Sequence, residues 1–125
     1  MSTSQQVAEA KSASQPDETR PFVDKGKVEV VHLSGGDAGL GTFEPGWRWS
    51  EHVKPLAGTD SCQVAHVGYV LQGRMHVAMD DGTNVEIAAG DFFTLPAGHD
   101  AWIVGDEACV MVDFGGLHGY AQQQR

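Results

Sequence analysis

The chain has 125 residues, which is enough for one domain and too few for two of ordinary size. Its formal net charge of −9 repels phosphate groups, so nucleic acids and anionic membranes are poor partners. Hydrophobic residues make up 41% of the sequence, so a core can form, but no stretch approaches the length of a membrane span.

The N-terminal segment, residues 1–20, is polar and contains no aromatic residue. Such a segment buries too little apolar surface to offset its ordering entropy, so we expect it to be disordered. It also has no signal-like apolar stretch. Cys62 and Cys109 lie in predicted strands, where a disulfide is geometrically open to them. We expect a cytoplasmic protein with two free, buried thiols.

From Lys27 onward, apolar residues recur at every second position, which is the period of a half-buried strand. Gly- and Pro-containing turns separate one such stretch from the next. We see no amphipathic helix and no internal repeat. The predicted strands are 28–33, 40–43, 47–54, 62–71, 74–79, 85–88, 92–95, 101–104 and 108–114.

Short strands at this spacing are typical of an all-β sandwich or barrel. The barrel would span residues 21–115, and residues 116–125 would be a C-terminal tail. Several strands are apolar on both faces, for example 108–114. A small barrel has only one interior, so an N-terminal strand or a second subunit must cover the other apolar face. We expect a homodimer.

Two segments carry a more specific pattern. The first places His52 six residues after Gly46 and closes with Tyr-Val-Leu-Gln-Gly at 69–73. The second runs from Gly-Asp to Pro-Ala-Gly over 90–98. Paired in this way, they resemble the two motifs of the cupin superfamily over roughly residues 40–114. The resemblance implies a double-stranded β-helix, also called a jelly-roll barrel, with a metal site inside.

The chain departs from the cupin pattern at most of the ligand positions. Lys54 stands at the second His position of the first motif, His66 at the Glu position, and Ala101 at the His position of the second motif. His52 matches in type and position, while His99 lies two residues early. The resemblance therefore implies His52, His66 and His99 as ligands of a divalent transition metal, namely iron, manganese, nickel, zinc or copper.

Two charged residues stand beside these expected ligands. On an ideal strand, Lys54 points to the same side as His52, whereas Glu51 points to the opposite side unless a bulge intervenes. Either residue would steer or protonate a small organic substrate. The resemblance implies an enzyme of dioxygenase, isomerase or decarboxylase type.

A second interpretation stays open. With Lys54 and Ala101 at two ligand positions, the barrel would have lost its metal and would bind or sense a small molecule without catalysis. Cys62 shares a strand face with His66 in the predicted register. We expect it to be a buried, inert thiol rather than part of the pocket.

Overall fold

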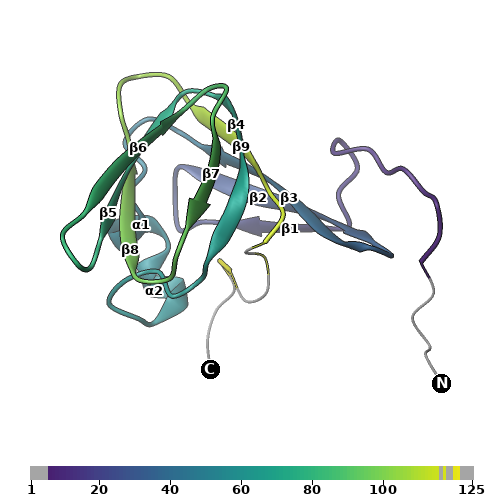
Figure 1. Cartoon of the computed structure of the whole chain (residues 1–125), viewed down its shortest axis with the longest axis horizontal. Coiled ribbons are helices and arrows are strands. Elements are labelled where there is room, and N and C mark those ends of the chain that lie inside the picture. The colour runs from purple at the N-terminus through teal and green to yellow at the C-terminus, as the bar shows by residue number, and fades with distance from the viewer. Residues whose placement is uncertain (1–5, 116, 118–119, 122–125) are drawn as a thin grey trace.

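The protein is described here by a computed structural model, which covers residues 6–115, 117, 120 and 121. These residues form strands and two short helices (Figure 1). In chain order the elements are β1 (Glu18–Pro21), β2 (Gly26–Leu33), β3 (Gly36–Phe43), α1 (Trp49–His52), α2 (Lys54–Ala57), β4 (His66–Gln72), β5 (Arg74–Met79), β6 (Asn84–Ala88), β7 (Phe92–Leu95), β8 (His99–Ile103) and β9 (Cys109–Asp113).

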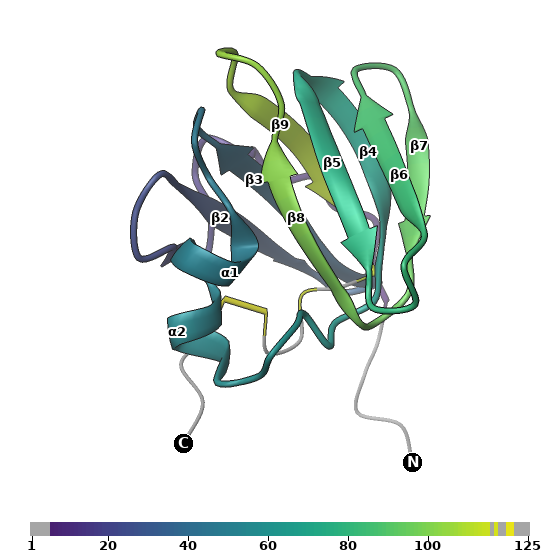
Figure 2. The ribbon, with the colours of Figure 1, turned by 90° about the vertical axis from the view of Figure 1, so that its left-hand side faces the viewer.

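The strands form two antiparallel sheets, one of six strands in the order β1-β2-β3-β9-β4-β7 and one of three in the order β6-β5-β8. The sheets face each other, with the small sheet in front of β3, β9 and β4 (Figure 2). Val70 of the large sheet and Val77 of the small sheet are fully buried between them. The prediction of an all-β jelly-roll barrel is confirmed.

Most predicted strands are present, and the ranges 74–79 and 92–95 coincide with β5 and β7. The predicted strand at 62–71 begins only at His66, with β4. Cys62 makes one isolated bridge to His99 and belongs to no regular strand. The loop before β4 is therefore attached to the start of β8, which matters for the site below.

The predicted strand at 47–54 is wrong, because this segment forms α1 and α2. Trp49 and Val53 are both buried and lie four residues apart, which is the spacing of one helical face. Pro55 sits in the first turn of α2, and Gly58 ends this helix in the left-handed conformation. No helix in the described part of the chain is long and apolar enough to cross a membrane.

The N-terminal segment also differs from the expectation of disorder over 1–20. Residues 18–20 belong to β1, the edge strand that pairs with β2, so the sheet starts before the expected boundary at residue 21. Upstream, Val7 exchanges hydrogen bonds with the Ser34 side chain, and Lys11 donates to the His32 carbonyl oxygen. Residues 1–5 lie outside the described part of the chain.

The expected C-terminal tail contributes to the core. Leu117, Tyr120 and Ala121 are buried, and Leu117 packs over the backbone of Gly39. The buried guanidinium of Arg20 donates hydrogen bonds to the carbonyl oxygens of Leu117 and Tyr120. A residue near the start of the domain thus holds the end of the chain against the barrel. Residues 116, 118–119 and 122–125 lie outside the described part.

Candidate metal centre

A small cavity lies inside the barrel. Its volume is about 40 Å³, which is room for a few water molecules. Three of its lining residues, His66, His99 and Asp113, are ionisable groups of the kinds that bind metals or protons, and the other walls are mostly apolar. The remaining lining residues are Val28, Gly41, Phe43, Trp47, Trp49, Met75, Phe93, Leu95, Ala101, Met111 and Tyr120.

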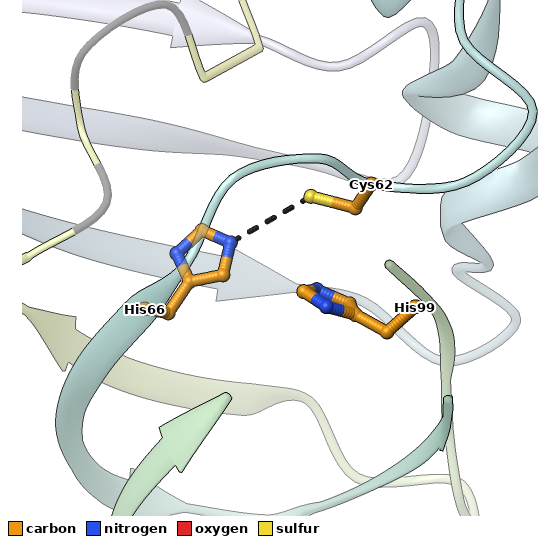
Figure 3. A group of neighbouring side chains, drawn as sticks. All are labelled: Cys62, His66 and His99. Carbon is orange, nitrogen blue, oxygen red and sulfur yellow. Dashed lines mark hydrogen bonds between the residues drawn. The ribbon is translucent and has the colours of Figure 1, made fainter. Parts of the chain in front are cut away.

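Cys62, His66 and His99 converge at one point beside this cavity (Figure 3). His66 is the first residue of β4 and His99 the first of β8, so each side chain enters from the start of a strand. Cys62 is brought in by the loop before β4, where its amide donates to the His99 carbonyl oxygen at 2.7 Å. All three side chains are buried, and one ligand atom from each lies within 4.8 Å of the others.

Hydrogen bonds fix the orientation of both imidazole rings. His66 Nδ1 lies 2.5 Å from Asp113 Oδ2 at the end of β9, and His99 Nδ1 lies 2.8 Å from the Pro96 carbonyl oxygen. Because both partners are acceptors, each ring donates its Nδ1–H, which leaves the Nε2 lone pair of the neutral ring free. His66 Nε2 lies 3.8 Å from Cys62 Sγ. Second-sphere hydrogen bonds of this kind orient metal-binding histidines.

The electrostatics of the cluster couple Cys62 to His66. Burial alone would raise the pKa of the Cys62 thiol, but hydrogen bonds and charge from His66 and His99 outweigh it and lower the pKa to about 6. Burial alone would lower the pKa of His66, but Asp113 and Cys62 raise it to about 9. In the metal-free protein at neutral pH, the two groups therefore form a thiolate–imidazolium pair.

The second thiol provides the contrast. Cys109 is fully buried on β9, and burial, with a smaller effect of Glu107, raises its pKa to about 12. It is a protonated, inert thiol at neutral pH, as we expected of both cysteines. Cys62 is also free and buried, but its neighbours lower its pKa, so its surroundings favour the thiolate.

The three side chains fit a transition-metal ion. Ligand atoms at tetrahedral bond lengths of ~2.0–2.3 Å lie about 3.3–3.8 Å apart. The separation between Cys62 Sγ and His66 Nε2 is 3.8 Å and no pair of ligand atoms exceeds 4.8 Å, so shifts below ~1 Å would bring all three atoms to coordination distance of one ion. Two imidazoles and one thiolate suit zinc, copper or iron, whereas manganese prefers oxygen ligands. The group therefore offers three ligands and leaves further positions open.

The structure brings His66 and His99 together, as the sequence predicted, and does not bring His52 to them. His52 lies on α1, where its Nδ1 accepts a hydrogen bond from the Arg48 amide at 3.0 Å. The resemblance implied His52 as a ligand on the premise that residues 47–54 form a strand, and alternation of side chains does not hold in the helix that forms instead. Cys62 stands where the third ligand was expected.

The two expected catalytic residues lie on the short helices, away from the cavity walls. Glu51 is exposed on α1. Lys54 is partly exposed on α2, with its Nζ 3.8 Å from Asp60 Oδ1. Neither residue lines the cavity. Their positions give no support to a role at the metal centre.

Two residues of the site escaped the sequence analysis. Asp113 ends β9, where the alternation of Cys109, Met111 and Asp113 toward the interior was the available signal. Tyr120 lies beyond the predicted domain, and its ring stands edge-on to His66 with centroids 5.0 Å apart. Burial raises the pKa of Tyr120 well above its usual value, so its hydroxyl keeps its proton. No local pattern placed Tyr120 in the cavity wall.

Comparisons with known proteins identify the family. A model of the EutQ-like cupin domain matches residues 40–111, which is more than half of the chain. The chain belongs to the EutQ-like cupin family. The match includes Cys62, His66 and His99, and it confirms the resemblance noted in the sequence. A comparison with curated proteins gives no match.

Solved structures with the same fold share little sequence with this cupin. A protein of unknown function from Acidithiobacillus ferrooxidans is 20% identical, with a TM-score of 0.57, covering 90% of this chain and 97% of its own. A cupin-superfamily sugar phosphate isomerase from Silicibacter pomeroyi is 17% identical (TM-score 0.55; 79% and 70% covered). A cupin-like protein from Thermotoga maritima is also 17% identical (TM-score 0.52; 78% and 74% covered). These likenesses establish the fold.

Proposed function

We propose that this cupin binds one transition-metal ion through Cys62, His66 and His99, and that the centre acts on a small organic molecule in the adjoining cavity. The observation that carries the proposal is the convergence of these three buried ligand atoms within 4.8 Å. Catalytic metal sites commonly have three protein ligands and an open position for substrate, whereas structural sites are closed by four.

The chain's own residues would perform distinct tasks around a bound ion. Asp113 holds the His66 ring so that Nε2 faces Cys62. The indole and phenyl groups of the cavity wall, such as those of Trp49 and Phe93, exclude water. The buried phenol of Tyr120 is a proton donor at the cavity wall. The ion would supply a Lewis acid to polarise an oxygen of the substrate.

The cavity favours a compact and largely apolar substrate. None of the described residues that line it is Lys or Arg, and the chain carries a net charge of −9. A phosphate group would therefore find no Lys or Arg to pair with in the cavity wall, and the negative charge of the chain disfavours its approach. The sugar phosphates named for the Silicibacter pomeroyi relative are poor candidates for this cavity. Isomerisation or decarboxylation needs only the Lewis acid, whereas dioxygenation also requires iron or copper.

Elemental analysis of protein purified without chelators tests the proposal. We expect close to one zinc, copper or iron ion per chain, and loss of that ion in Cys62→Ala and in His99→Ala. Titration of apoprotein with Co²⁺ should give a thiolate charge-transfer band that Cys62→Ala abolishes. His52→Ala and Cys109→Ala are matched controls, because both positions are buried and lie outside the cluster.

Two results would overturn the proposal. One is wild-type protein that binds neither native metal nor added Zn²⁺, Cu²⁺, Fe²⁺ or Co²⁺ above background. The other is a metal content that depends on His52 and not on Cys62. Circular dichroism of each variant separates loss of ligand from loss of fold.

One observation favours a second function, a binding barrel without metal. Cys62 Sγ lies 3.8 Å from His66 Nε2, and each group shifts the pKa of the other toward its charged form, so the two side chains partner each other without a metal. In that case the thermal midpoint of the protein would rise with a small organic ligand and not with divalent ions. A screen of both compound classes against apoprotein separates the two functions.

A further inference from the structure

The candidate metal centre is buried, so an ion can reach it only where part of the chain moves aside. His66 begins β4, which is paired on both sides, with β9 and β7. His99 begins β8, which is paired with β5. Cys62 is the one ligand of the three that lies outside a regular strand. The segment that carries Cys62 is therefore the part of the site that is easiest to displace.

We use the term covering segment for residues 59–63, in the connection between α2 and β4 that runs along one end of the barrel (Figure 2). Ser61 and Cys62 are its buried residues, and the others are exposed. On one side, Gly58 has a left-handed backbone and open space around it. On the other side, Val64 packs against the core. Rotation about Gly58 would lift the covering segment while Val64 stays in place.

Two sets of hydrogen bonds hold the covering segment down. In the backbone, Cys62 and the turn before β8 are joined, with the Gly98 amide donating to the Cys62 carbonyl oxygen at 2.6 Å. Between side chains, the Ser61 hydroxyl donates to Asp80 Oδ2 at 2.7 Å. We use the term latch for this second bond. The Asp80 amide also donates to the Gly98 carbonyl oxygen at 2.9 Å, so Asp80 contacts both the segment and the turn that leads to His99.

The covering segment is organised around Ser61. The Thr59 hydroxyl donates to the Ser61 carbonyl oxygen at 2.7 Å, and the Gln63 side-chain amide donates to Ser61 Oγ at 3.0 Å. These bonds lie within the segment, so they stiffen it without attaching it to the barrel. The segment would therefore move as one unit, and the latch acts on all of it.

The charges beside the covering segment suit the passage of a cation. The Asp60 side chain is fully exposed, and Asp80 supplies a second carboxylate at the latch. Lys54 Nζ lies 3.8 Å from Asp60 Oδ1 and offsets one of these charges. The net charge of the whole chain, −9, also attracts divalent cations.

We infer that the covering segment opens to admit the metal ion and that the latch between Ser61 and Asp80 keeps it closed. This inference rests on the proposed function, because exchange of an ion presupposes that the centre binds one. Opening would carry Cys62 away from His66 and His99, so the thiolate would be the first ligand to leave the ion. While the closed form predominates, the latch sets the rates of uptake and release and leaves the affinity nearly unchanged.

Stopped-flow measurements of Zn²⁺ uptake by apoprotein, and of its transfer from the loaded protein to a chromophoric chelator, test the inference. Both rates should rise about tenfold in Ser61→Ala and in Asp80→Ala, which corresponds to ~1.4 kcal/mol of lost latch. The dissociation constant should change less than about threefold. Asp80→Asn keeps an acceptor oxygen and should behave like wild type. Asp81→Ala is the matched control, because it removes the same charge and a similar bond, from the Thr83 hydroxyl at 2.6 Å, in the same turn.

A second measurement needs no metal. Iodoacetamide reacts with the buried Cys62 thiol only when the covering segment opens, and its rate is followed by mass spectrometry of apoprotein in a Cys109→Ala background. We expect about tenfold faster alkylation in Ser61→Ala and in Asp80→Ala. Combining the two substitutions should add little, because both break the same bond. Circular dichroism shows that each variant is folded.

The outcomes separate this inference from the proposed function. Faster alkylation and faster Zn²⁺ exchange at nearly constant affinity, absent from Asp81→Ala, support the inference. Unchanged alkylation in the latch variants would overturn it. So would faster alkylation without faster exchange, which indicates another route, or an affinity loss above tenfold, which indicates that the latch holds the ligand itself. If wild type binds no metal, the proposed function fails, while the alkylation rates still support or overturn the opening of the segment.

Discussion

The Asp113 carboxylate offers the sharpest test of how the centre is built. In Asp113→Asn the amide oxygen can still accept the His66 Nδ1–H, but the negative charge is lost. Without that charge, burial dominates and the pKa of His66 falls from about 9, so the thiolate–imidazolium pair with Cys62 weakens. Loss of such a second-sphere carboxylate lowers metal affinity by about 10–100-fold.

The substitution also has a predictable cost in stability. The two oxygens of Asp113 accept from His66 Nδ1 at 2.5 Å and from the Gly115 amide at 3.0 Å. An asparagine has only one acceptor oxygen, so its amide nitrogen would face one of these donors. An unmade buried hydrogen bond costs about 1–3 kcal/mol, and the thermal midpoint should fall accordingly.

Competition between apoprotein and a chromophoric Zn²⁺ chelator measures the affinity, at temperatures below the midpoint of the variant. Asp37→Asn is the matched control, because Asp37 makes a similar contact to His32 (Oδ1 to Nδ1, 2.9 Å) on the surface. We expect no change in metal affinity for Asp37→Asn. Equal affinities for wild type and Asp113→Asn would refute the role given to this carboxylate.

Two further predictions concern the metal-free protein. The pKa of His66 is raised from 6.5 to about 9 on folding, so its contribution to stability is complete below pH 6.5 and is lost as pH rises through 9. The pKa of Cys62 is lowered from 9.0 to about 6 on folding, so its contribution is complete above pH 9.0 and is lost as pH falls through 6. Between pH 6.5 and 9, Cys62 and His66 together hold one proton in both the folded and the unfolded protein, so the urea midpoint of the wild type should be nearly constant over this range. The urea midpoint of Cys62→Ala should decline over the same range, because only His66 then titrates. Parallel curves for the two proteins would contradict this. Gly68→Ala should destabilise the protein more than Gly39→Ala. The new Cβ at position 68 would meet the rigid backbone at the Val112 carbonyl oxygen at 2.0 Å, whereas the new Cβ at position 39 would meet the flexible Leu117 side chain at 2.6 Å. Thermal denaturation checks the order, with a cost of about 1–3 kcal/mol expected for Gly39→Ala.

The sequence predicted the fold well because its strand signals are local. Alternating apolar residues and Gly-containing turns define β2, β5 and β7 without reference to the rest of the chain. His66 and His99 were found through the resemblance to the cupin motifs, and in the structure each begins a strand. The ring orientation of His66 was not predictable, because it depends on Asp113 in a strand 47 residues away.

The errors fall where local patterns are ambiguous or long-range contacts decide. Trp47 and Trp49 alternate as in a strand, yet Trp49 and Val53 also match a helix, and the helix forms. This choice moved His52 away from the ligands. Cys62 reaches the site through backbone hydrogen bonds between its loop and the start of β8, which no local pattern specifies.

The cavity wall is assembled from the two ends of the chain. Arg20, near the start of the sheet, holds the backbone of Tyr120, whose ring faces His66. Trimming the polar leader through Arg20 to obtain a shorter protein would remove this anchor and loosen the phenol at the far end. Shortened versions of the protein should therefore keep Arg20.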